Sequence, residues 1–236
     1  MKPVALIAGN FVREQRWPIV VLLAWILLLA AAPFVSDLSR SRDDLLFLLQ
    51  QVATYVLVFV VFFGISAIRN ERKSRRILMV LAKGISRSQY IGGLLVGMVA
   101  ASAIFCGALV ISGLAVLRNF GYAPAQVVFL MVALLVACLL TGAVTLFFSV
   151  FLHPLVAAAA TFGLLGVPVV LAKTLGPAWQ FVLPVFPLLN GFYHLSGPDA
   201  HLPKWGFIAC GALESVLVWR AASWAFARKD VTVAVE

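Results

Sequence analysis

The residue with the clearest potential for chemistry is Glu214, the only carboxylate well inside an apolar stretch of this 236-residue chain. An ionisable group at the bilayer centre costs about 2.5–3.5 kcal/mol on insertion scales, so something must compensate for it. Two interpretations follow. The carboxylate carries out intramembrane chemistry, such as proton or ion coupling, or it accepts a hydrogen bond from a hydroxyl or backbone group within the helix bundle.

The motifs of nucleotide-binding and hydrolytic proteins are absent from the sequence. There is no G-x-x-x-x-G-K-[ST] phosphate loop, no H-E-x-x-H and no G-x-S-x-G. Cys106, Cys138 and Cys210 are dispersed through apolar runs, which is typical neither of a disulfide framework nor of a metal site. His153 stands alone at the edge of an apolar run, where a turn or headgroup contact is its usual role. We expect no enzyme activity, metal or cofactor in this chain.

Segment 69–89 is the second candidate site. It holds seven of the 18 basic residues and one acidic residue, Glu71, for a net charge of +6. A segment this basic between apolar runs is retained on the cytoplasmic side of a membrane. Topology and contact with anionic lipid would suffice to explain the charge.

The same segment is also patterned as a short amphipathic helix. Ile77, Leu78 and Leu81 share one helical face, here named the apolar ridge. The basic residues on the other faces are Arg72, Arg75, Arg76 and Lys83. Ser86, followed three residues later by Gln89, predicts the capping box of the next helix. The alternative to a purely topological role is that the ridge docks into a groove on a cytoplasmic protein.

The composition is that of a multi-pass membrane protein, because 63% of the residues are hydrophobic and only 11% are charged. The net charge of +9 does not indicate nucleic acid, since the basic residues cluster beside apolar runs. A hydrocarbon core about 30 Å thick needs about 20 helical residues, and six stretches fit. They are 17–35, 45–68, 90–117, 125–152, 155–172 and 205–226.

Two further segments complete the predicted single transmembrane domain, 1–236. Residues 1–16 place apolar side chains at helical spacing and predict an interfacial helix on the inner leaflet. Segment 174–203 is interrupted by Gly and Pro every few residues, which disfavours a full span. We expect two re-entrant half-helices there on the external side, shielded by protein. This topology puts 13 basic residues inside and five outside, so both termini are predicted to be cytoplasmic.

Small residues mark two helix faces for close packing. The start of the fifth apolar stretch is rich in alanine and glycine, and Ala159, Gly163 and Gly166 form a face suited to contact between helices or between subunits. Gly93 and Gly97 form a G-x-x-x-G spacing in the third stretch, which permits close helix approach.

Segment 69–89 resembles the first intracellular loop of ABC-2-type transporter permeases. The resemblance is carried by Glu71, the Leu-Ala step at 81–82, the Ile-Ser-Arg run at 85–87 and a helix that continues through Ile91. Gly84 and Gly93 stand where that family usually has Pro and Lys. At the other end of the chain, the family's closing pattern is matched by Phe226, Arg228 and Asp230.

The resemblance implies six spans in a type V exporter-like fold, a permease dimer and a separate cytoplasmic ATP-binding subunit that holds ATP and magnesium. It further implies that the first intracellular loop couples the two subunits. The residues expected to do so here are Glu71, Arg72, Arg75, Arg76, Ile77, Leu78 and Leu81. The expected location is a bacterial cytoplasmic membrane.

Two other function classes stay open. A stand-alone secondary transporter using Glu214 would usually show inverted repeats and several intramembrane charges, which this sequence lacks. An intramembrane enzyme would need converging polar groups, but His194 and His201 accompany no nucleophile motif.

The charge count generates a topology prediction. Reporters fused after Lys83 and after Glu236 should both respond as cytoplasmic, and one inserted near Asp199 should respond as external. An external reporter at Glu236 would mean that segment 174–203 crosses the membrane completely.

Overall fold

The computed structural model describes residues 2–35, 42–73, 85–117, 123–194 and 205–228, and every regular element within these ranges is a helix. In chain order they are α1 (Lys2–Glu14), α2 (Arg16–Val35), α3 (Arg42–Lys73), α5 (Arg87–Leu117), α6 (Pro124–Phe151), α7 (Pro154–Leu175), η3 (Pro177–Phe181), α8 (Val185–His194) and α9 (Trp205–Arg228). The predicted all-α class is confirmed.

Within the described residues, five helices are long and apolar enough to cross a membrane: α3, α5, α6, α7 and α9. The predicted first span corresponds to α2, a helix of 20 residues. Its described apolar part, Arg16–Leu28, is shorter than the other five. The multi-span membrane class is therefore confirmed, and the sixth crossing stays a prediction.

Helix α3 is longer than the predicted span 45–68 at both ends. It begins at Arg42, because Asp43 and Asp44 in its first turn interact favourably with the positive end of the helix dipole. It continues to Lys73, since residues 69–73 are not interrupted by glycine or proline. Segment 69–89 thus begins with a further turn of helix rather than a loop.

Helix α6 forms the centre of the bundle and packs against α3, α5, α7, α8 and α9. Glycines let its neighbours come close. A Cβ added at Gly64 on α3 would lie 2.7 Å from Cγ2 of Thr145, and one added at Gly142 on α6 would lie 3.1 Å from Cε of Met98. The Thr145 hydroxyl donates to the carbonyl of Thr141 in its own helix at 2.7 Å, so burial leaves it satisfied.

The G-x-x-x-G pair on α5 receives the N-terminal helix α1. A Cβ added at Gly93 would lie 2.7 Å from Cβ of Ile7, and one at Gly97 would lie 2.8 Å from Cδ1 of Phe11. Phe11 is 4% exposed and its ring meets Phe63 of α3 edge-on at 6.3 Å. The apolar face predicted to lie on lipid is therefore packed against protein, because two glycines open a groove of matching spacing.

A polar contact fixes the end of α1 against α3. Gln15, which is 6% exposed and lies between α1 and α2, donates from Nε2 to Oγ of Ser66 at 3.4 Å. The Ser66 hydroxyl in turn donates to the carbonyl of Phe63 at 3.1 Å. The N-terminal helix is thus held by both apolar and polar contacts.

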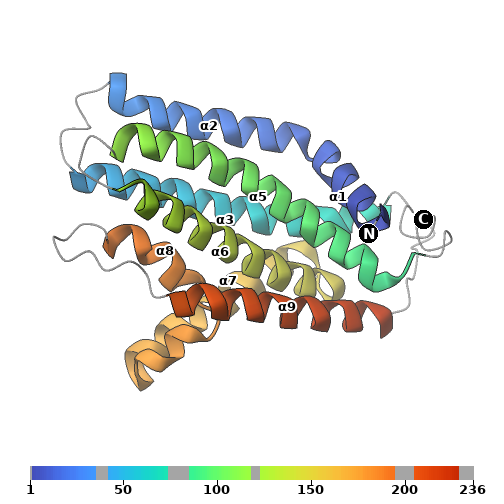
Figure 1. Ribbon diagram of the computed structural model, residues 1–236. Helices are drawn as coiled ribbons and strands as arrows, with labels where there is room; N and C mark the ends of the chain where they lie inside the picture. The colour runs from blue at the N-terminus through green and yellow to red at the C-terminus, as the bar shows by residue number, and fades with distance from the viewer. Residues whose placement is uncertain (1, 36–41, 74–84, 118–122, 195–204, 229–236) are drawn as a thin grey trace.

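The helix ends gather at two opposite ends of the bundle (Figure 1). One end, here named the junction end, holds the end of α3 at Lys73, the start of α5 at Arg87 and the end of α9 at Arg228, with α1 beside them. At the far end, α3 begins at Arg42, α9 begins at Trp205, and the short helix α8 lies near both.

The contact between α1 and α5 predicts opposite outcomes for two glycines of the same helix. Gly93→Ala should lower the melting temperature, because the added Cβ would lie 2.7 Å from Cβ of Ile7. Overpacking of this kind typically destabilises a fold by about 1–3 kcal/mol. A Cβ added at Gly107 would meet no described atom within 4 Å, so Gly107→Ala should leave the stability of the fold unchanged or raise it by about 0.5–1 kcal/mol. Thermal unfolding in one detergent compares them; equal melting temperatures would contradict the close approach.

Candidate functional site

The predicted coupling residues divide into two groups. Glu71 and Arg72 lie in the last turns of α3. The other five, Arg75, Arg76, Ile77, Leu78 and Leu81, lie outside the described residues. The structure resumes at Ile85, and from there it defines how the segment joins the bundle.

The predicted capping box is confirmed at the start of α5. The backbone N–H of Gln89 donates to Oγ of Ser86 at 3.2 Å, and the backbone N–H of Ser86 donates to Oε1 of Gln89 at 3.2 Å. These reciprocal bonds satisfy two N–H groups that a helix start leaves without an intrahelical acceptor. The position at which segment 69–89 enters α5 is therefore well defined.

Arg87 connects this helix start to the end of α9. Its Nη1 donates to the carbonyl of Phe226 at 3.0 Å and to the carbonyl of Ala227 at 2.8 Å. The last carbonyls of a helix lack intrahelical donors and lie at the negative end of the helix dipole, so a guanidinium is a suitable partner. We name this contact the Arg87 clamp.

An aromatic contact reinforces the Arg87 clamp. The ring of Tyr90, one turn further along α5, stacks on that of Phe226 with centroids 6.0 Å apart. The Arg87 guanidinium also lies 6.0 Å from the centroid of Phe226. The two segments that carry the family resemblance, 71–93 and 226–230, thus meet at Arg87 and Phe226. Sequence reasoning noted both residues but could not pair them, because they are 139 positions apart.

Glu214 has a backbone partner. Its Oε2 accepts a hydrogen bond of 2.9 Å from the N–H of Leu183, in the short connection between η3 and α8. Leu183 has φ of 50°, a left-handed conformation that costs an L-residue about 1–2 kcal/mol. Its carbonyl accepts from the N–H of Val185 at 2.7 Å. The carboxylate of Glu214 therefore stabilises a strained turn, which agrees with the second of the two interpretations given above.

The segment predicted to contain two half-helices does contain two short helices, η3 and α8. The beginning of α9 packs closely on them. The ring of Phe207 stacks on that of Phe181 with centroids 4.4 Å apart, and a Cβ added at Gly206 would lie 3.3 Å from Cε1 of Phe181. Gly211 similarly lies against Pro184. That these helices re-enter a membrane stays a prediction.

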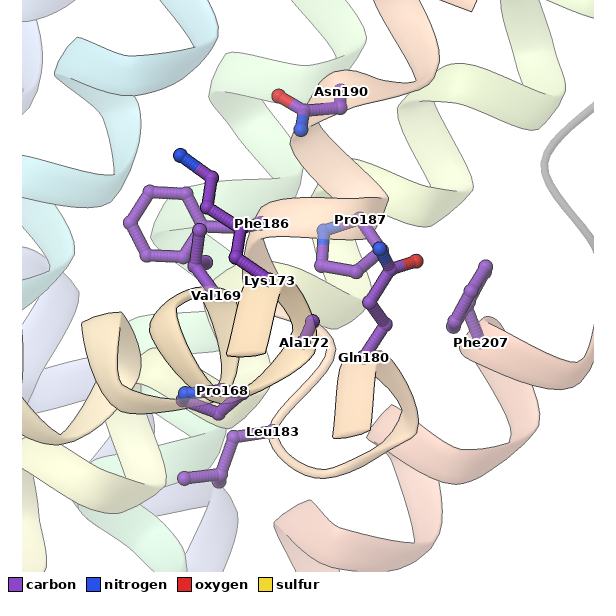
Figure 2. A pocket seen from close by; sticks show the side chains of 10 residues that line it. All are labelled: Pro168, Val169, Ala172, Lys173, Gln180, Leu183, Phe186, Pro187, Asn190 and Phe207. Carbon is purple, nitrogen blue, oxygen red and sulfur yellow. The ribbon is translucent and has the colours of Figure 1, made fainter. Parts of the chain in front are cut away.

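A pocket of about 280 Å³ lies between α7, η3, α8 and α9 (Figure 2). Its lining is Pro168, Val169, Ala172, Lys173, Gln180, Leu183, Phe186, Pro187, Asn190 and Phe207. Sequence reasoning missed this pocket, because its residues come from four elements whose relative placement no local pattern specifies.

The small-residue face on α7 is left open by the part of the chain that the structure describes. Ala159 and Gly163 are exposed, and a Cβ added at Gly163 or at Gly166 would meet nothing within 4 Å among the described residues. Large apolar side chains on α7 are exposed as well, Leu155 at 77% and Val170 at 62%. This face is free to contact lipid or a second copy.

The three cysteines singled out from the sequence lie on α5, α6 and α9. Cys106 and Cys138 are buried and Cys210 is partly buried, each as a free thiol. In the described part of the chain, no three His, Cys, Asp or Glu side chains lie where they could hold one metal ion. Comparison of the chain with protein-family models, curated proteins and solved structures finds no match.

The role of Glu214 at the strained turn predicts a difference between two substitutions. Glu214→Ala removes the acceptor for the N–H of Leu183 and should destabilise the fold by about 1–3 kcal/mol. Glu214→Gln keeps an amide oxygen at the same place and should retain most of the stability. Thermal unfolding in detergent measures both. An equal loss would mean that the negative charge, rather than the hydrogen bond, is what the fold needs.

Proposed function

We propose that this chain is the membrane-spanning permease subunit of an ATP-driven ABC-2-type transporter, working as an exporter in a bacterial cytoplasmic membrane. It has six spans with both termini in the cytoplasm, and it couples through segment 69–89 to a separate ATP-binding subunit. The observation that carries this proposal is the Arg87 clamp, in which the two segments that resemble the family contact each other.

The clamp supplies what such a permease needs mechanically. The sequence has no phosphate-binding loop, so energy from ATP has to arrive through a protein contact. A partner docked on the apolar ridge would push on the connection between α3 and α5. Arg87 joins the start of α5 to the end of α9, and α1 packs on Gly93 and Gly97. A displacement of the start of α5 would therefore act on three helices: α1, α5 and α9.

The arrangement of helix ends is consistent with the proposed topology. The junction end combines the last turns of α3, the first turn of α5 and the end of α9 (Figure 1). Each of these three places contributes basic residues. They are Arg69, Arg72 and Lys73 in α3, Arg87 in α5 and Arg228 in α9. One basic end of a bundle is the cytoplasmic end under the positive-inside rule.

The proposed dimer uses the face of Ala159, Gly163 and Gly166 on α7. Small residues allow the backbones of two helices to approach closely in lipid, where hydrophobic burial contributes little to association. This face is exposed in a single copy, and an added Cβ at either glycine meets no described atom. Contact with a second copy would bury it.

Removing the apolar ridge tests the coupling directly. Burial of one Leu is worth about 1.5–3 kcal/mol, so Leu78→Ala with Leu81→Ala should weaken binding of the ATP-binding subunit at least about tenfold. Membrane insertion should be unaffected, since neither residue lies in a span. The measurement is the affinity and ATPase activity of the proposed ATP-binding subunit, co-reconstituted with this chain in proteoliposomes.

The matched control is Leu213→Ala with Leu217→Ala, which removes two exposed leucines from α9. This control should bind and stimulate the ATP-binding subunit as the wild type does. If the ridge variant also retains full binding and ATPase activity, segment 69–89 is a topological anchor only. Transport without any ATP-binding subunit would favour a secondary transporter instead.

A further inference from the structure

The pocket between α7, η3, α8 and α9 has a role that coupling to an ATP-binding subunit does not explain. The end of α7, with η3, α8 and the start of α9, lies at the far end of the bundle, away from the Arg87 clamp (Figure 1). Seven of the ten lining residues are apolar, and the polar ones come from three different elements: Lys173 on α7, Gln180 on η3 and Asn190 on α8. Convergent polar groups in an otherwise apolar pocket are typical of a ligand site.

The charge of the lining residues indicates the charge of the ligand. Among the residues that the structure describes, Lys173 is the one charged residue in the lining, and none of the lining residues is a carboxylate. Figure 2 shows the ammonium group of Lys173 at the same end of the pocket as the amide of Asn190. Oδ1 of Asn190 accepts from Nε2 of Gln50 at 3.5 Å, which leaves the NH₂ of Asn190 as a donor. An ammonium and amide donors together favour a phosphate or carboxylate.

A simpler explanation for Lys173 is that it stabilises the end of α7. It lies in the last turn of that helix, where a cation interacts favourably with the dipole. That effect needs no amide partners from other elements, yet Gln180 and Asn190 both line the same pocket. A cation and an amide donor from another element at the same end of the pocket are therefore better explained by a bound anion (Figure 2).

The size of the pocket indicates what the anion is attached to. A volume of about 280 Å³ is at the lower limit of small-molecule sites, which run from roughly 300 to 1,000 Å³. The pocket therefore holds a head group and the first carbons of a chain, but not a whole amphiphile. Beside it, α7 presents the exposed apolar side chains Val167 and Val170, along which the rest of a chain can lie.

We propose that this pocket binds the anionic head group, a phosphate or carboxylate, of a membrane amphiphile whose acyl or alkyl chain lies along the outside of α7. Lys173 neutralises the head group and Asn190 donates a hydrogen bond to it. The aromatic ring of Phe186 covers the first carbons. That the amphiphile is the transported cargo rests on the proposed transport function, whereas the binding site itself does not.

Native mass spectrometry of the purified full chain tests this site without an ATP-binding subunit. The chain is held in dodecyl maltoside, whose neutral head group and identical alkyl chain make it an internal control. It is titrated with dodecyl phosphate and, separately, with inorganic phosphate. We expect saturable binding of one dodecyl phosphate per chain and weaker binding of inorganic phosphate.

Three substitutions locate the site. Lys173→Gln should weaken dodecyl phosphate binding about tenfold, equivalent to 1.4 kcal/mol, and Lys173→Arg should restore most of the affinity. Arg220→Gln removes an equal charge from an exposed position of α9 outside the lining, and it should bind as the wild type does. Melting temperatures of all three variants check that the fold is intact.

Several results would overturn the proposal. Equal affinities for inorganic phosphate and dodecyl phosphate would make this a site for free anions. Equal losses of dodecyl phosphate affinity in Lys173→Gln and Arg220→Gln would mean that binding depends on general surface charge rather than on this pocket. The absence of saturable binding would mean the same. None of these results bears on coupling at segment 69–89, and loss of that coupling would leave binding in this pocket unchanged.

Discussion

The contact on which the arrangement depends most is the Arg87 clamp. A helix leaves its last carbonyls without intrahelical donors, and a hydrogen bond from a charged donor to such a carbonyl contributes about 1.5–3 kcal/mol. The guanidinium of Arg87 satisfies two of them, those of Phe226 and Ala227, with charge-assisted hydrogen bonds. This contact joins the start of α5 to the end of α9.

Close packing extends this connection to the N-terminal helix and to the centre of the bundle. Gly93 and Gly97 bring α1 onto α5, and Gly64 and Gly142 bring α3 and α5 onto α6. Because lipid supplies little hydrophobic force between helices, such glycine contacts have to provide the specificity. A displacement at the junction end would therefore act on closely packed helices. At the far end, the turn at Leu183 depends instead on one carboxylate, Glu214.

Much of this architecture follows from sequence alone, and the rest does not for a physical reason. Apolar length predicted the helices, and Ser86 with Gln89 predicted a capping box whose two bonds the structure contains. Helix periodicity states which face is apolar but not what covers it. Periodicity alone therefore predicts that the apolar face of α1 lies on lipid, whereas in the structure this face packs on Gly93. The partners of Arg87 and Glu214, and the pocket, likewise depend on distant segments that only the tertiary fold brings together.

The measurement that tests the account most directly is ATP turnover by the ATP-binding subunit reconstituted with Arg87→Gln, with Arg220→Gln as a charge-matched control on α9. The account predicts that Arg87→Gln still binds that subunit through the apolar ridge but no longer alters its rate of ATP hydrolysis, because α5 and α9 move independently. Arg220→Gln should behave as the wild type. Wild-type coupling in Arg87→Gln, or the failure of the unaltered chain to bind any ATP-binding subunit, would contradict the account.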